Sequence, residues 1–279
     1  MTADTKSKID SETELAAKIP SGSQTLLRGL DVLELVTDGP INLGDLSART
    51  GLTKTTTHRL AAALVERGYL SFVPREGYNL GPKLLELGYH ATQQINLPRI
   101  ARPHLEALSD QSDDTVHLGV REGDRALYLD KISGNRRVEV QSRVGERQPL
   151  RSTGLGKALL LDESEEQWRR CFEIEEARGQ SRIALPEFLR RMRDYAAQGR
   201  AFDLEENEDR IRCIAAPVRD ASGRVVAAIS LSSAAQYLDD ARMAQLAGDV
   251  VATARAISQD LGWAEHRVRP AKSRRSVRQ

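Results

Sequence analysis

The spacing of apolar residues changes along this chain, and the change limits the folds that it can adopt. From Ser23 to about residue 112, apart from two short runs around PREG, apolar residues recur every three or four positions, as they do in amphipathic helices. After Asp113 they alternate with a period of two in TVHLGV and RALYLDKI, which predicts β-strands. Helical patterns return in GLGKALLL, SEEQWRRCF and PEFLRRMRDYAAQG, and over roughly 239–261. The sequence therefore predicts an α+β protein with a helical first part and a mixed second part.

Residues 23–81 show the order of elements found in a winged helix-turn-helix. QTLLRGLDVLELV predicts a first helix, NLGDLSARTG a short second helix, and TKTTTHRLAAALVER a third. Two short β-prone runs around PREG then predict a hairpin. The apolar face expected for the first helix comprises Leu26, Leu30, Leu33 and Val36. In such a motif the last helix enters the major groove of DNA.

The third helix begins with small hydroxyls and bases, where better helix formers would be expected. On a helix over 53–67, Thr57 and Ala61 share the inner side, while the outer face has no acid before Glu66. Short hydroxyls allow close approach to DNA, and basic side chains favour its phosphates. The candidate DNA contacts are Thr53, Lys54, Thr55, Thr56, His58 and Arg59. The alternative is an ordinary surface helix capped by Thr53, since the charge of this region is balanced.

Two glycines stand near the start of the helix predicted by RSTGLGKALL. Ser152 or Thr153 can cap this helix, and Gly154 and Gly156 leave the first backbone amides bare. Bare amides at the positive end of a helix suit a carboxylate. The amides of Gly154 and Leu155 are therefore candidate ligand contacts, and the alternative is a simple tight turn.

Polar residues interrupt the apolar strands predicted near the end of the chain. Ser230 and Ser232 share one face of AISLSS, and Cys213 belongs to the alternating run IRCIAAPV. Such residues are typical of a pocket wall, and Asp203 in AFDLEE can accept hydrogen bonds from ligand hydroxyls. For Cys213 alone, the alternative is a buried structural thiol. A further strand is expected at VEVQSR, residues 138–143.

Several separated motifs together resemble the IclR family of bacterial transcription regulators. SQTLLRGLDVLELV, LSARTGLTKTTTHRLAAAL and YNLGPKLLELG resemble its DNA-binding domain. VGERQPLRSTGLGKALL and FDLEENEDRIRCIAAPVRDASGRVVAAISLS resemble its effector domain, so the likeness covers about residues 23–262. RPHLEALSDQSDDTVHLGV and ISQDLGW are similar to the subgroup of 2-keto-3-deoxygluconate (KdgR-like) repressors. The wing SFVPREGYNLG is short, and the basic tail is peculiar to this chain.

The resemblance implies a repressor of a catabolic operon that works as a homodimer or homotetramer on a pseudo-palindromic operator. Its effector would be a small organic acid, either a keto sugar acid or an aromatic or other carboxylic acid. The family's effector pocket would comprise Gly154, Leu155, Asp203, Cys213, Ser230 and Ser232. The expected organisation is a disordered segment (1–22), the winged helix-turn-helix (23–81), a linker helix (82–97), a GAF-like mixed α/β effector-binding domain (98–263) and a basic tail (264–279).

The composition of the chain argues against disulfide-rich, membrane-spanning, secreted and catalytic classes of protein. Two cysteines in 279 residues make no disulfide framework and fit a reducing cytoplasm. No apolar run approaches the length of a membrane span, and the start lacks the apolar region of a signal peptide. An enzyme with Cys213 as nucleophile and His117 as base is one alternative, but no catalytic motif supports it. A ligand-binding module without a role on DNA is another, and it would leave residues 23–81 unexplained. The five histidines are scattered, so neither a metal nor a cofactor is expected.

Overall fold

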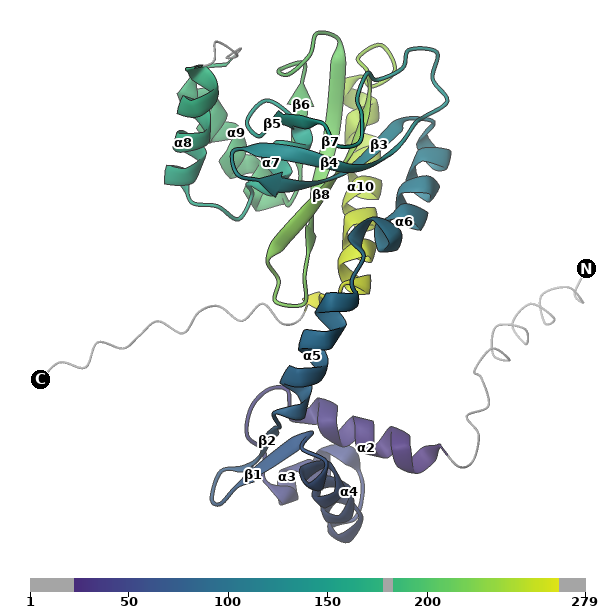
Figure 1. The fold of residues 1–279 in the computed structure, drawn as a ribbon, viewed down its shortest axis with the longest axis vertical. Coiled ribbons are helices and arrows are strands. Elements are labelled where there is room, and N and C mark those ends of the chain that lie inside the picture. Colours follow the sequence, from purple (N-terminus) through teal and green to yellow (C-terminus); the bar gives the residue numbers. More distant parts are fainter. Residues whose placement is uncertain (1–22, 178–182, 266–279) are drawn as a thin grey trace, which may run out of the picture. The chain divides into compact units, whose positions relative to one another are not determined.

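The structure, a computed structural model, describes residues 23–177 and 183–265. The predictions for residues 1–22 and for nearly all of 264–279 lie outside these ranges. The chain divides between Gln94 and Ile95 into two compact units (Figure 1). None of the described helices is long and apolar enough to cross a membrane.

The first unit is a winged helix-turn-helix followed by one further helix. Its elements are α2 (Gln24–Leu35), α3 (Leu43–Thr50), α4 (Lys54–Glu66), β1 (Leu70–Val73), β2 (Gly77–Leu80) and α5 (Lys83–Gln94). The Asn42 side chain caps α3 by accepting from the amide of Asp45 at 3.0 Å. Gly51, with φ at +68°, ends α3 in the left-handed conformation that glycine adopts without strain, and this turn leads into α4.

The buried face of α2 differs from the predicted one. Val32 and Val36 are buried in the small core of this unit, and Leu33 packs against them. Leu26 and Leu30, which belong to the predicted face, are 66% and 43% exposed. Only the C-terminal half of α2 contributes buried residues, so its leucine spacing continues beyond the part that packs on the core.

The second unit is a six-stranded antiparallel sheet between two layers of helices (Figure 1). Its strands are β3 (Thr115–Glu122), β4 (Arg125–Ile132), β5 (Arg147–Pro149), β6 (Ala201–Leu204), β7 (Ile211–Arg219) and β8 (Val225–Ala234). They are ordered β5-β4-β3-β8-β7-β6. The helices are α6 (Leu97–Ser112), α7 (Gly154–Leu159), α8 (Glu165–Glu176), α9 (Leu185–Gln198) and α10 (Asp240–Asp260). The predicted α+β class is confirmed.

Each face of the sheet has its own hydrophobic core. Ile214 and Ala216 on β7 belong to the core beneath α6 and α10, whereas Ala215 belongs to the core beneath α7, α8 and α9. This alternation follows from the period of two along a strand. Buried polar side chains occur on both faces of the sheet: Ser109 and Ser112 of α6 lie on one face, and those near the start of α7 line a cavity on the other.

The prediction of a strand at residues 138–143 is wrong. That stretch runs without regular secondary structure between β4 and β5. β4 is paired on this edge by Arg147–Pro149 instead, opposite Arg125–Leu127. The carbonyls of Val140 and Ser142 accept hydrogen bonds from the Lys131 ammonium, at 2.9 and 3.0 Å, in place of a neighbouring backbone. Alternating polar and apolar residues do not make a strand where no partner edge is free.

Candidate DNA-binding helix and effector cavity

The structure places the candidate DNA contacts on the outer side of α4. Lys54, Thr55, His58 and Arg59 are exposed, while Thr57 and Ala61 on the inner side are buried. The four exposed side chains make no hydrogen bond or ion pair to any residue that the structure describes. A helix with unpaired basic side chains and hydroxyls at its N-terminal end has the geometry needed to contact base edges in the major groove of DNA.

Two of the six candidate contacts also hold the start of α4 in place. Thr53 caps the helix by accepting from the amide of Thr56 at 3.3 Å, and its hydroxyl donates to the Thr56 hydroxyl at 3.0 Å. The hydroxyl of Thr57 donates back to the carbonyl of Thr53 at 3.1 Å. The threonines thus compensate for their modest helix propensity with local hydrogen bonds.

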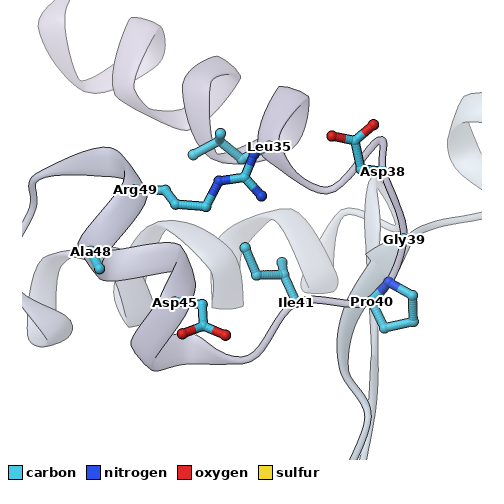
Figure 2. Close-up of a pocket in the computed structure, with 8 residues that line it drawn as sticks. All are labelled: Leu35, Asp38, Gly39, Pro40, Ile41, Asp45, Ala48 and Arg49. Carbon is cyan, nitrogen blue, oxygen red and sulfur yellow. The ribbon is translucent and has the colours of Figure 1, made fainter. Parts of the chain in front are cut away.

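An open groove of about 370 Å³ lies elsewhere on the first unit, between the end of α2, the following turn and α3. Figure 2 shows Arg49 reaching from α3 toward Leu35, with Asp38 in the connecting turn. The Asp45 carboxylate at its rim accepts a hydrogen bond from the Asn42 side chain at 2.7 Å. The charged side chains that line the groove are exposed to solvent. None of them is a buried charge that a ligand would have to pair.

All six predicted effector residues line one cavity in the second unit: Gly154, Leu155, Asp203, Cys213, Ser230 and Ser232. The strand register explains why they meet. Asp203 on β6 pairs with Cys213 on β7, and Cys213 pairs with Ser232 on β8. Residues directly opposite each other on neighbouring strands point to the same face of the sheet. That face is covered by α7, whose first residues complete the cavity.

The start of α7 presents free amides to the cavity. The Thr153 hydroxyl caps the helix by accepting from the amide of Gly156 at 3.0 Å. The amides of Gly154 and Leu155 have no acceptor among the described residues. A Cβ at Gly154 would lie 3.1 Å from the Cβ of Cys213, and one at Gly156 would lie 2.4 Å from the Leu150 carbonyl oxygen. Gly154 therefore lets α7 pack closely on β7, and Gly156 lets it pack on the backbone of Leu150, just after β5.

A buried ion pair fixes the segment that follows Asp203. The Lys157 ammonium lies 2.7 Å from a Glu206 carboxylate oxygen and donates to the Phe202 carbonyl at 2.9 Å. Asp203 accepts from the amide of Glu206 at 2.8 Å. Burial raises the pKa of Asp203 to about 6, although Lys157 and the Glu206 amide act in the opposite direction. The carboxylate is therefore largely ionised at neutral pH, while almost fully buried.

Cys213 is a poor nucleophile in this setting. Its sulfur accepts from the Ser232 hydroxyl at 3.1 Å and lies 4.0 Å from the Asp203 carboxylate. Burial, and then the negative charge of Asp203, raise the pKa of the thiol far above its usual range. Burial and the nearby Lys131 lower the pKa of His117 to about 3. The pair suggested as a catalytic alternative therefore holds a protonated thiol and a very weak base.

His117 also lines the cavity, although it was not among the predicted effector residues. His117 is only 1% exposed, stacks on Tyr128 with ring centroids 4.7 Å apart, and lies opposite Ser230 in the register of β3 and β8. Its Nε2 is 2.7 Å from the Ser142 hydroxyl, while its Nδ1 has no partner among the described residues. The available signal was a single polar residue inside the apolar run TVHLGV, weaker than the pair that Ser230 and Ser232 form at positions i and i+2.

Comparisons with known proteins agree with this two-part arrangement. The model of the "IclR helix-turn-helix domain" matches residues 25–74, and that of the "Bacterial transcriptional regulator IclR C-terminal" matches residues 89–259. The regulator XynR of Escherichia coli is 34% identical over 86% of this chain and 98% of its own. The regulator KdgR of Escherichia coli is 32% identical over 89% of this chain and 97% of its own. The crystal structure of the Agobacterium tumefaciens repressor BlcR has a TM-score of 0.73 and 26% identity, over 86% of this chain and 98% of its own.

The chain belongs to the IclR family of transcriptional regulators. It is a DNA-binding regulator and not an enzyme, as its family and its named relatives show. The KdgR-like resemblance is consistent with the 32% identity to KdgR.

Replacement of Asp203 by Asn should stabilise the protein at neutral pH. The folded pKa of Asp203 is raised from 3.8 to about 6, so the free energy of unfolding falls as the pH rises through that window. Asp203→Asn should raise the free energy of unfolding by about 1–3 kcal/mol at pH 7.5, and by less at pH 5. Urea unfolding of the wild type and the variant measures this change in the free energy of unfolding at each pH. Asp110→Asn, on the exposed side of α6, is the control. An equal change in the free energy of unfolding at both pH values would contradict the raised pKa of Asp203.

Proposed function

We propose that the chain is a repressor that binds its operator through α4 and responds to a hydroxylated carboxylic acid held in the cavity beneath α7. The observation that supports the ligand class is a pair of neighbouring polar groups without partners. His117 Nδ1 and the Ser230 hydroxyl lie opposite each other on β3 and β8, are almost fully buried, and make no hydrogen bond to any described residue. Buried polar groups are costly unless something pairs with them, and a hydroxylated ligand would do so.

The other groups of the cavity favour the same chemistry. The amides of Gly154 and Leu155 are donors for a carboxylate, and Asp203 is an acceptor for hydroxyls. An aromatic or aliphatic effector would leave these groups unpaired, at a cost of about 1–3 kcal/mol each. A keto sugar acid carries both a carboxylate and hydroxyls, and the resemblance to the KdgR-like subgroup points to this class. The candidate contacts remain Gly154, Leu155, Asp203, Cys213, Ser230 and Ser232, joined by His117.

On the DNA side, the proposed contacts are Thr53, Lys54, Thr55, Thr56, His58 and Arg59. In this proposal residues 23–81 bind DNA and residues 98–263 bind the effector. The protein acts in the cytoplasm as a homodimer or homotetramer on a pseudo-palindromic operator, because a two-fold protein matches two half-sites.

Arg59→Ala should weaken operator binding by about 1–3 kcal/mol if Arg59 reads a base. Lys54→Ala should weaken binding to all sequences and reduce the slope of affinity against salt concentration, because a phosphate contact releases counterions. Fluorescence anisotropy on DNA from upstream of the coding region measures both. Arg67→Ala, at the opposite end of α4, is the matched control. Unchanged operator affinity in a folded Arg59→Ala protein would exclude a base contact by Arg59.

Ser230→Ala should weaken binding of 2-keto-3-deoxygluconate by about 1–3 kcal/mol, because the ligand hydroxyl loses its partner. Isothermal titration calorimetry measures the change, and DNA binding without the acid should stay as in the wild type. Ser222→Ala, in the exposed β7–β8 turn, tests for effects of the same substitution outside the cavity. Tight binding of an aromatic acid with no response to Ser230→Ala would show that the proposed ligand class is wrong.

A further inference from the structure

The effector cavity is too small for an organic acid in the state that the structure describes. Its volume is about 30 Å³, whereas ligand pockets usually measure about 300–1,000 Å³. Such a space accommodates water, since one water needs about 10–15 Å³ of this kind of volume. A wall of the cavity must therefore move before any effector of the proposed class can enter.

Two irregular stretches contribute walls that are capable of moving. One is the turn after β6, which contributes Asn207 and Glu208. Three contacts hold this turn in place. The Glu206 carboxylate pairs with Lys157 at 2.7 Å and with Arg191 at 2.9 Å. The Ser152 hydroxyl donates to the side-chain oxygen of Asn207 at 3.2 Å. Separating the charges of a buried ion pair costs free energy, so this wall is the less mobile of the two.

The other wall is the covering segment, residues 137–144, which contributes Val140, Gln141 and Ser142 to the cavity. Its ends are anchored. Just before it, Arg136 pairs with the fully buried Asp114 at 3.2 Å. Just after it, the amide of Gly145 donates to the Tyr128 carbonyl at 2.8 Å. Between these anchors the segment has no strand or helix of its own.

Two side chains on neighbouring strands connect the covering segment to the sheet. The Lys131 ammonium donates to the carbonyls of Val140 and Ser142, and His117 Nε2 is hydrogen-bonded to the Ser142 hydroxyl at 2.7 Å. Among the described residues, these bonds are all the hydrogen bonds that join residues 137–144 to the sheet. Lys131 and His117 are register partners on β4 and β3, so they hold the segment from one point.

We infer that Lys131 is a positioning residue that holds the covering segment closed over the effector cavity and thereby controls entry of the effector. The inference rests on the proposed function, because it assigns a route to the proposed ligand. A carbonyl that accepts from a charged donor is held more strongly than one that accepts from a neutral donor. The Lys131 bonds therefore favour the closed state, and the apparent affinity for an effector is reduced by the small fraction of open protein.

Cys213 provides a readout that requires no effector. It lines the cavity with the covering segment, whereas Cys171 on α8 does not line it and is buried in the core cluster that includes Trp168 and Phe172. Opening of the segment should expose Cys213 alone to a thiol reagent such as N-ethylmaleimide, and global unfolding should expose both cysteines. Mass spectrometry of the digested protein follows the two labelling rates separately.

Lys131→Met, which keeps the aliphatic stem, should raise the labelling rate of Cys213 by about tenfold or more and leave that of Cys171 unchanged. Ser142→Ala, which removes the bond to His117, should raise the Cys213 rate by a smaller factor. Lys131→Arg, which keeps a charged donor, should restore most of the protection. Arg137→Met is the matched control, because it removes an exposed charge from the same segment without touching Lys131 or His117.

An unchanged Cys213 rate in Lys131→Met would overturn the inference, whatever the rate in Ser142→Ala. So would an equal rise at both cysteines, since Lys131 would then act on the stability of the whole unit. Labelling in the presence of 2-keto-3-deoxygluconate separates this inference from the proposed function. If Lys131→Met exposes Cys213 but the acid never protects it, the positioning role stands and the proposed ligand class fails.

Discussion

The site depends on one buried ion pair. Lys157 extends from α7 to Glu206, and it also donates to the carbonyl of Phe202, the residue before Asp203. This contact joins the helix that presents free amides to the strand that presents a carboxylate. Both partners are almost completely buried, so breaking the pair would leave a charge without compensation inside the protein. The distance between these two elements of the cavity is therefore set by an interaction that is costly to disrupt.

Polar groups are buried on both faces of the sheet, but they are used differently. Asp114 is fully buried but has charged partners: Arg136 and Arg242 lie 3.2 and 2.7 Å from its carboxylate oxygens, and the Ser233 hydroxyl donates to it at 2.7 Å. Such a cluster holds segments in place. In the cavity beneath α7, by contrast, His117 Nδ1 and the Ser230 hydroxyl have no partner in the described protein. A folded chain tolerates unpaired groups of this kind where a ligand completes them, and the raised pKa of Asp203 reflects the same local cost.

Much of this arrangement was predictable from the sequence. Repetitive local patterns defined α4, its cap and its exposed face, and the period of two placed Ser230 and Ser232 on one strand face. The family resemblance, not the periodicity, put Cys213 in the same pocket. The errors arose where long-range packing decides the outcome. Leu26 and Leu30 continue the helical spacing of α2 beyond its core, and residues 138–143 alternate like a strand although β5 occupies the available edge. His117 was missed because a single polar residue in a strand has no meaning until its register with Ser230 is known.

The central claim is that occupation of the cavity changes the affinity of α4 for DNA. The most direct measurement is a fluorescence anisotropy titration of DNA from upstream of the coding region, with and without saturating 2-keto-3-deoxygluconate. Coupling between two sites on one protein typically changes affinity by about 5–150-fold, and DNA must change the affinity for the acid by the same factor. We expect the acid to weaken DNA binding by a factor in this range in the wild type. Binding of the acid by calorimetry with no change in DNA affinity would contradict the account.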